Sequence, residues 1–209
     1  MSAEDAVMEE QRVLASDWGG GKSPVGTSWG KLMMWLFLMS DALTFAGLLV
    51  GYGVMRMSAG RWPYQYNIFN INAVVGPMTF ILICSSVTMA AAVAAARMND
   101  HRKVRLFLGL TILGGLMFLS MQAYEWSHFI GEGARLTTNP WGVPMFSTTF
   151  FVITGFHGSH VTSGVIYLLV VAGKEGRRRY SAETIEIAGL YWHFVDLVWV
   201  FIFTLLYLI

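Results

Sequence analysis

The sequence predicts an all-α membrane protein built as a bundle of five transmembrane helices. Of the 209 residues, 55% are hydrophobic and 13% are charged, whereas soluble domains carry about 25% charged residues. The mean hydropathy is positive, at +0.53. Apolar runs of about 18 or more residues recur, and each is long enough to cross the hydrocarbon core of a bilayer. Composition and run length therefore exclude a soluble globular domain.

The five expected spans are helices, because an open strand would leave backbone groups unpaired in lipid. They cover approximately 31–56, 72–97, 104–127, 146–173 and 187–209. The stretch 1–29 is polar, acid-rich and then glycine-rich, and it lacks the basic start and short apolar core of a cleavable signal peptide. We therefore expect a flexible N-terminal tail at 1–29 followed by one five-helix domain at 30–209.

Small and special residues fit these spans. Pro77 falls in the first turns of the second span, where its missing N–H is tolerated. Alanines crowd 90–96, and glycines recur from Gly109 to Gly115, which suits close packing of helices. The loops at 61–64 and 139–142 combine proline with aromatic residues, a composition typical of ordered turns at a membrane interface.

The distribution of basic residues predicts the orientation. Five spans place the N-terminal tail and the loops 97–104 and 173–186 on one side of the membrane. The positive-inside rule puts that side in the cytoplasm, so the N-terminus is expected to be cytoplasmic and the C-terminus outward. That side carries eleven Lys and Arg (Arg12, Lys22, Lys31, Arg97, Arg102, Lys103, Arg105, Lys174, Arg177, Arg178, Arg179), and the other carries three (Arg56, Arg61, Arg135).

Ionisable residues inside four spans are the candidate functional residues, because such groups are costly at bilayer depth. Asp41 lies ten residues past Lys31, about 15 Å into the bilayer. Glu125 ends the third span. A buried carboxylate without a fixed cation can exchange a proton near neutral pH, so Asp41 and Glu125 are candidates for proton handling.

The remaining polar residues are first interpreted as structural. His157 and His160 share a face of the fourth span. Glu186 begins the fifth span, where His193 and Asp196 stand three residues apart on one face and can share a neighbour. The simplest interpretation is a polar network in which these five residues hydrogen bond one another and hold the bundle together.

A metal site is a weak alternative. The sequence Glu125-Trp126-Ser127-His128 has the Glu-x-x-His spacing of di-iron bundles, but those need two copies and two further carboxylates. Three histidines, His157, His160 and His193, are enough in number for a zinc site. The sequence contains no nucleophile elbow, phosphate loop, dinucleotide fingerprint or Cys-x-x-Cys-His haem motif. We expect no metal, catalytic centre or cofactor in this chain.

Four motifs in the same order resemble subunit III of the haem–copper oxygen reductases. They are 191–199 (YWHFVDLVW), 154–161 (TGFHGSHV), 122–126 (QAYEW) and 40–45 (SDALTF), and the similarity runs from about residue 30 to the end. Longer members of that family have seven spans and a lipid-filled cleft, whereas this chain resembles the shorter five-helix bacterial members. Longer members also carry a carbodiimide-reactive glutamate where Asp41 stands.

The resemblance implies an accessory, non-redox subunit of an aerobic respiratory terminal oxidase, most simply a cytochrome c oxidase. Haem and copper would reside in partner subunits. Subunit I would be the direct partner and would reduce oxygen, and subunit II would also belong to the complex. This chain would support proton uptake into subunit I and its stability, in the cytoplasmic membrane of a bacterium and within a proton-pumping oxidoreductase complex. Nothing suggests nucleic acid, and membership of a respiratory supercomplex stays open.

The resemblance also implies bound phospholipid. Lys174 occupies the position of a basic residue that contacts lipid phosphate in longer members, and Arg177 begins a basic run that can attract anionic lipid. Three alternatives stay open. They are subunit III of a quinol oxidase, an accessory subunit of a nitric oxide reductase, and an independent proton-coupled transporter that uses Asp41 and Glu125.

Overall fold

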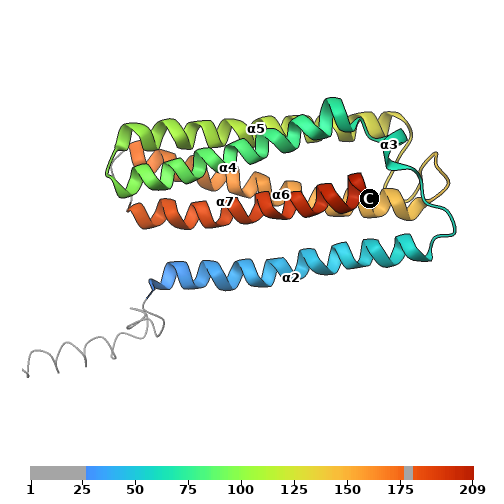
Figure 1. Cartoon of the computed structure of the whole chain (residues 1–209), viewed down its shortest axis with the longest axis horizontal. Helices are drawn as coiled ribbons and strands as arrows, with labels where there is room; N and C mark the ends of the chain where they lie inside the picture. Colours follow the sequence, from blue (N-terminus) through green and yellow to red (C-terminus); the bar gives the residue numbers. More distant parts are fainter. Residues whose placement is uncertain (1–26, 177–180) are drawn as a thin grey trace, which may run out of the picture.

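The computed structural model describes residues 27–176 and 181–209, which contain long helices and no strand (Figure 1). The predicted N-terminal tail lies outside the described residues up to position 26, as do Arg177, Arg178 and Arg179. The long helices are α2 (Trp29–Ser58), α4 (Gly76–Arg97), α5 (His101–Gly131), α6 (Pro144–Gly176) and α7 (Ala182–Ile202). A short helix, α3 (Gln65–Ile68), and two π-helical turns, η1 (Ile71–Val75) and η2 (Phe203–Leu208), complete the described part.

The prediction of five membrane-spanning helices is confirmed. Five helices in the described part are long and apolar enough to cross a membrane, counting η1 with α4 and η2 with α7. Each predicted span falls within one of them to within a residue, and the observed helices run a few residues further at most ends. Hydropathy marks the apolar centre of a span, whereas capping residues beyond it decide where the helix stops.

The second span begins with a wide turn rather than an α-helical one. In η1 the N–H of Gly76 bonds to the carbonyl oxygen of Ile71, five residues back. Pro77 follows within the first two positions of α4 and has no N–H to donate. The π-helical turn therefore ends just where the proline would interrupt the α-helical hydrogen-bond ladder.

The third span is longer than predicted, because α5 continues to Gly131 instead of ending near residue 127. Its end is set by Gly133, whose φ of +94° is a left-handed conformation that favours glycine. Glu125 is therefore held within the helix, with more than a full turn beyond it.

The core of the bundle lies where α4, α5, α6 and α7 pack on one another. The expected close packing of small residues is confirmed for Gly114 and Gly115 of α5. A Cβ atom on Gly114 would lie 2.7 Å from Cβ of Ser85 on α4, and one on Gly115 would lie 2.6 Å from the Trp192 ring on α7. Ala92, at 0% exposed, is likewise buried in α4.

Helix α2 lies along the outside of this core (Figure 1). It packs mainly against α7 and less against α6, and it buries the smallest share of its residues among the five spans. Most of its apolar side chains, including Leu36 and Leu43, are exposed. Asp41 is one of the few α2 residues that are buried, so its contacts are with the rest of the bundle.

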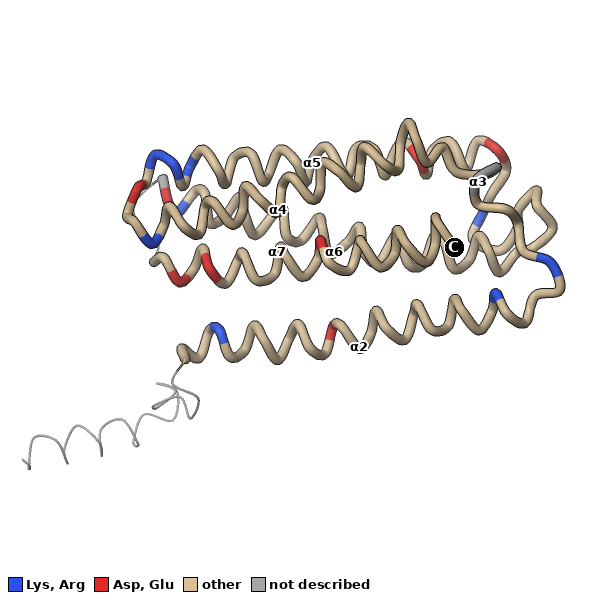
Figure 2. The backbone as a smooth tube through the Cα atoms, in the orientation of Figure 1, with Lys and Arg blue, Asp and Glu red and all other residues tan. Residues whose placement is uncertain are grey.

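The two ends of the bundle differ in how many basic residues they carry (Figure 2). We call one the basic end; its described basic residues are Lys31, Arg97, Arg102, Lys103, Arg105 and Lys174. We call the other the α3 end; it holds Arg56, Arg61 and Arg135.

Both loops at the α3 end are ordered, as predicted. Trp62 packs edge-on against Tyr52 and Phe146, with ring centroids 5.6 Å apart in each pair. The side-chain amide of Asn139 donates to the carbonyl oxygen of Val143 at 2.5 Å and to the hydroxyl of Ser147 at 2.9 Å. These bonds tie the loop to the first turns of α6.

Candidate functional site

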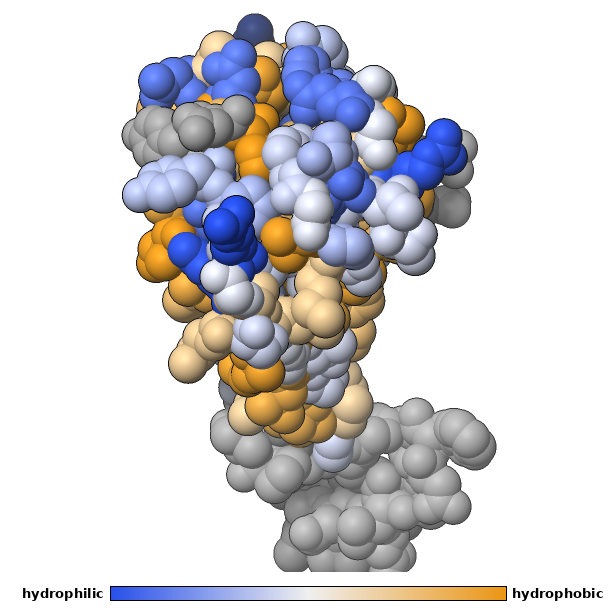
Figure 3. All heavy atoms as spheres, turned by 90° about the vertical axis from the view of Figure 1, so that its right-hand side faces the viewer, coloured by the Kyte–Doolittle hydropathy of each residue, from blue (hydrophilic) through white to orange (hydrophobic). Residues whose placement is uncertain are grey.

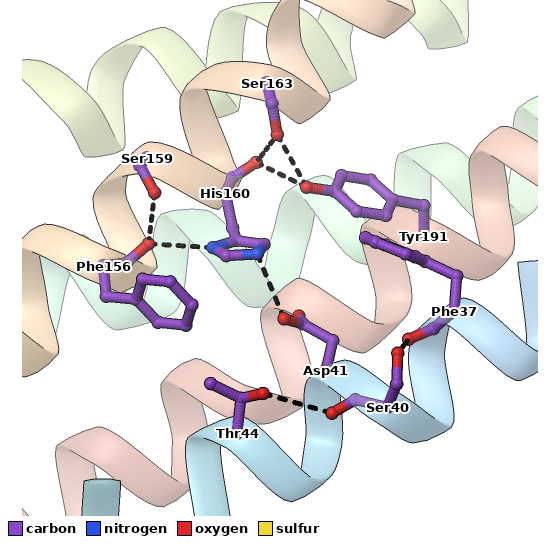
Figure 4. Close-up of polar contacts among 9 residues, drawn as sticks. All are labelled: Phe37, Ser40, Asp41, Thr44, Phe156, Ser159, His160, Ser163 and Tyr191. Carbon is purple, nitrogen blue, oxygen red and sulfur yellow. Dashed lines mark hydrogen bonds and ion pairs between the residues drawn. The ribbon is translucent and has the colours of Figure 1, made fainter.

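Asp41 of α2 and His160 of α6 form the central pair of the candidate site (Figure 4). The carboxylate oxygen Oδ1 lies 3.3 Å from the imidazole Nε2, and both side chains are largely buried. The other ring nitrogen, Nδ1, lies 2.9 Å from the carbonyl oxygen of Phe156. A carbonyl oxygen can only accept a hydrogen bond, so Nδ1 carries a proton.

This arrangement requires a second proton in the pair. With Nδ1 already protonated, a neutral imidazole would present the lone pair of Nε2 to a carboxylate oxygen, and two acceptors would face each other. A contact at 3.3 Å therefore needs a proton between them, held by Nε2 of His160 or by the carboxyl group of Asp41. The second carboxylate oxygen, Oδ2, is buried and has no hydrogen-bond partner in the described part of the chain.

Neighbouring side chains fix the position of His160. Its ring packs edge-on against Phe45, at 5.3 Å between centroids, and Phe156, at 4.7 Å. Its backbone carbonyl accepts hydrogen bonds from Ser163 at 2.9 Å and from Tyr191 of α7 at 3.0 Å. The pair thus lies where α2, α6 and α7 meet, as Figure 4 shows.

Glu125 lies in a second and separate polar group toward the α3 end. Its Oε2 accepts hydrogen bonds from the side-chain amide of Gln122 at 3.0 Å and from the hydroxyl of Tyr207 at 2.9 Å. Glu125 is only 6% exposed, and it lines a cavity of about 70 Å³ together with Asn70 and His128. Both hydrogen bonds to Glu125 are accepted by the same oxygen, Oε2. The cavity that Glu125 lines is large enough to hold water.

The five residues expected to form one polar network make no hydrogen bond to one another in the described residues. His160 faces Asp41, Glu186 lies at the basic end, and His157 has neither ring nitrogen hydrogen bonded within that part. His157 is fully buried and packs against Trp199, with ring centroids 5.1 Å apart. Spacing along a helix places residues on a common face but does not say which neighbours that face meets.

His193 and Asp196 share a neighbour, as their spacing suggested. Ser86 of α4 has its hydroxyl 2.5 Å from Nδ1 of His193 and is also the polar neighbour of Asp196. Neither carboxylate oxygen of Asp196 has a hydrogen-bond partner in the part of the chain that is described. Ser86 was not predicted from the sequence, because a serine in an apolar helix most often bonds its own backbone.

Ion pairs connect three helices at the basic end of the bundle. Glu186 of α7 bridges Lys31 of α2 at 2.9 Å and Arg97 of α4 at 3.0 Å. Lys174 lies exposed in the last turn of α6, and Arg177 falls outside the described residues.

The sequence interpretation missed Glu175. This carboxylate is 2% exposed at the end of α6, and it lies 3.3 Å from Nδ1 of His101 and 3.5 Å from Nε of Arg105. His101 and Arg105 are four residues apart and so lie on one face of α5. This spacing could have predicted an acidic partner for that face.

The family model for cytochrome c oxidase subunit III matches residues 14–209. The chain belongs to the cytochrome c oxidase subunit III family. Its resemblance to subunit III, predicted from four motifs, is therefore confirmed.

Relatives in this family cover nearly the whole chain. Cytochrome c oxidase subunit 3 of Bacillus sp. (strain PS3) is 34% identical over 205 residues, which are 95% of this chain and 96% of the relative. The protein of the same name from Synechocystis is 36% identical over 178 residues, 83% of this chain and 73% of the relative. A probable quinol oxidase subunit 3 of Staphylococcus epidermidis is 32% identical over 183 residues, 86% of this chain and 88% of the relative.

Membership of the subunit III family makes the chain a multi-pass membrane subunit of a respiratory haem–copper oxidase, an oxidoreductase complex, with partner subunits of that oxidase. The described residues contain no group of three or more His, Cys, Asp or Glu side chains placed to hold a metal ion.

Proposed function

We propose that this chain sustains proton uptake and the working life of the catalytic subunit I of its oxidase, and that the Asp41–His160 pair is the part that exchanges a proton. The observation that carries the proposal is the fixed imidazole of His160. Its Nδ1 is occupied by the Phe156 carbonyl, so the proton between Nε2 and Asp41 Oδ1 is the one that can move. The free Oδ2 of Asp41 is the second point through which that proton can enter or leave.

The surroundings of the pair support this role. Asp41 is the one acid of α2 and lies in the middle of that helix, while the ion-paired acids Glu186 and Glu175 lie at the basic end. An acid that serves only to anchor helices gains most from a strong basic partner such as arginine. Asp41 faces a histidine, whose ring nitrogens can donate or accept a hydrogen bond according to which of them carries a proton. Glu125 is a second candidate, because it is buried beside a small cavity.

We further propose that haem and copper belong to partner subunits I and II and that the electron donor is cytochrome c. The Bacillus and Synechocystis relatives are named for cytochrome c oxidase and support that donor. The Staphylococcus relative is named for quinol oxidase, which makes quinol the second candidate. A pull-down of the tagged chain in mild detergent, read by optical spectrum and mass spectrometry, identifies the partners. A colourless chain that brings no larger multi-span protein would contradict the proposal.

We place the basic end in the cytoplasm and the α3 end outside, in the cytoplasmic membrane of a bacterium. The described part carries six Lys and Arg at the basic end (Lys31, Arg97, Arg102, Lys103, Arg105, Lys174) against three at the α3 end (Arg56, Arg61, Arg135). The exposed Lys174 is then at the level of the cytoplasmic lipid phosphates and is the proposed lipid contact, together with Arg177 outside the described residues. Reporter fusions after residue 99 and after residue 138 test this orientation, and an active periplasmic reporter is expected only at the second position.

The test of the proton role replaces Asp41 in the assembled oxidase. Asp41→Asn keeps the shape of the side chain and removes the titrating proton, so we expect unchanged haem content, slower turnover and faster inactivation during turnover. Asp41→Glu restores an acid and should restore much of both. Ser40→Ala is the matched control, since the Ser40 hydroxyl bonds the Phe37 carbonyl of its own helix and no other group in the described part of the chain. Wild-type turnover and wild-type lifetime in Asp41→Asn would reduce the pair to a packing contact.

A further inference from the structure

A groove of about 400 Å³ opens between α5 and α6 at the α3 end of the bundle. A cavity of this size lies within the range that holds small molecules. Its lining is apolar except for one cation, and consists of Trp126, Ile130, Ala134, Arg135, Leu136, Phe151 and Val152. None of the residues of the Asp41–His160 pair or of the Glu125 group takes part in it.

The apolar wall of the groove is held in place. The indole N–H of Trp126 donates to the hydroxyl of Thr154 on α6 at 3.2 Å. The Trp126 ring also packs edge-on against Phe151, with centroids 5.2 Å apart. Ile130 and Val152, at 52% and 41% exposed, complete the apolar surface of the groove. A fixed apolar wall of this kind orders an acyl chain at little entropic cost to the protein.

Arg135 lines this groove, four residues beyond the last residue of α5. Its backbone N–H bonds to the carbonyl oxygen of Thr138 at 2.7 Å, which fixes the loop. Its guanidinium is exposed and has no ion pair or hydrogen bond within the described part of the chain. The nearby acid Glu132 lies instead 3.6 Å from Nδ1 of His128.

The position of this cation relative to the membrane is informative. Figure 3 looks at the α3 end and shows polar residues gathered over it, with hydrophobic residues among them and around them. The end of a membrane-spanning helix is the level of the lipid headgroups. A guanidinium there presents a fork of donors that matches the oxygens of a phosphate.

We propose that the groove between α5 and α6 binds an anionic phospholipid of the leaflet at the α3 end. Its phosphate contacts Arg135, and one acyl chain lies on Trp126, Ile130 and Val152. Arg135, the one cation in the lining, favours an anionic lipid, and the apolar side chains of the lining favour an acyl chain. This site is at the opposite end of the bundle from Lys174 and does not depend on the proton role of Asp41.

The test measures how firmly the purified full-length chain retains phosphatidylglycerol. The chain is reconstituted in phosphatidylcholine bilayers that contain a minority of phosphatidylglycerol, and native mass spectrometry counts the lipids that remain bound. We expect one retained phosphatidylglycerol, and about fivefold weaker retention in Arg135→Gln, the usual contribution of one basic residue at a lipid surface. Arg61→Gln is the matched control, because Arg61 is an exposed cation of the same end that does not line the groove.

A second variant tests the contribution of the apolar wall separately from the charge of Arg135. Val152→Trp fills the apolar wall and leaves Arg135 in place, and it should also lower retention of phosphatidylglycerol. Equal losses in Arg135→Gln and Arg61→Gln would show only diffuse attraction to this end of the bundle and would overturn the site. Unchanged retention in either Arg135→Gln or Val152→Trp, or equal retention of phosphatidylcholine and phosphatidylglycerol by the wild-type chain, would overturn it as well.

Discussion

Tyr207, in the last turn of the described chain, donates its hydroxyl to Oε2 of Glu125 in α5 at 2.9 Å. The tyrosine is fully buried and packs against Phe69, with ring centroids 4.5 Å apart. This contact joins η2 to α5 and holds the last turn against the bundle.

Removing the Tyr207 hydroxyl should destabilise the bundle measurably. Tyr207→Phe keeps the ring packing and deletes one donor to a buried carboxyl group, so we expect the free energy of unfolding to fall by about 1 kcal/mol. Tyr124→Phe is the control, because Tyr124 is exposed and its neighbour Glu125 receives its bonds from elsewhere. The measurement is unfolding by denaturing detergent in mixed micelles, and equal stability of the two variants would contradict the contact.

Because α5 and α7 approach closely at Gly115, the stability cost of a glycine-to-alanine substitution in α5 should depend strongly on its position. A Cβ at this position would lie 2.6 Å from the Trp192 ring and 2.7 Å from Val165, so Gly115→Ala should cost about 1–3 kcal/mol of unfolding free energy. Gly109→Ala on the same helix meets nothing within 4 Å and should be neutral or slightly stabilising. Thermal unfolding of the two variants in one detergent compares them, and a smaller loss at Gly115 than at Gly109 would refute the packing.

The two acids of the basic end should differ in their contributions. Glu175 is buried between His101 and Arg105, so Glu175→Gln should lower stability by about 1–3 kcal/mol. Glu186 bridges Lys31 and Arg97 near the surface, so Glu186→Gln should cost less than about 1 kcal/mol. Unfolding at low and high salt tests the distinction, because only the Glu186 effect should shrink with added salt. The reverse salt dependence would count against it.

The loop between α4 and α5 should respond to acid through Asp100. The backbone N–H of Lys103, and next its side chain, hydrogen bond the carboxylate and hold the pKa of Asp100 below its usual value of 3.8. Because the folded pKa is the lower one, the stabilisation is present above the usual value and is lost as the pH falls through the folded pKa. The start of α5 should therefore open in acid.

Hydrogen exchange of the segment 98–104 measures this opening. As the pH falls from 6 to below the folded pKa of Asp100, the wild-type protein should lose protection relative to Asp100→Asn, because asparagine keeps a capping oxygen that does not titrate. Comparing the two proteins at each pH removes the intrinsic pH dependence of exchange. Parallel curves would mean that Asp100 does not control the helix start.

How much of this protein the sequence predicts depends on the range of the interactions involved. The five spans, the tolerated Pro77 and the ordered loops follow from hydropathy and turn chemistry, which act over a few residues. The family also follows from the sequence, because its motifs are contiguous stretches of residues. The requirement that every backbone group in lipid be hydrogen bonded leaves the helix as the structure for each span.

The partners of the buried polar groups were decided only by the tertiary structure. Asp41 meets His160, Glu125 meets Tyr207, and Glu175 meets the face of α5 that carries His101 and Arg105. Lipid tails are as apolar as leucine, so hydropathy does not distinguish a side chain that faces lipid from one that faces a neighbouring helix. Close packing at small residues such as Gly115 sets which helix faces meet, and that packing exists only once all the helices are assembled.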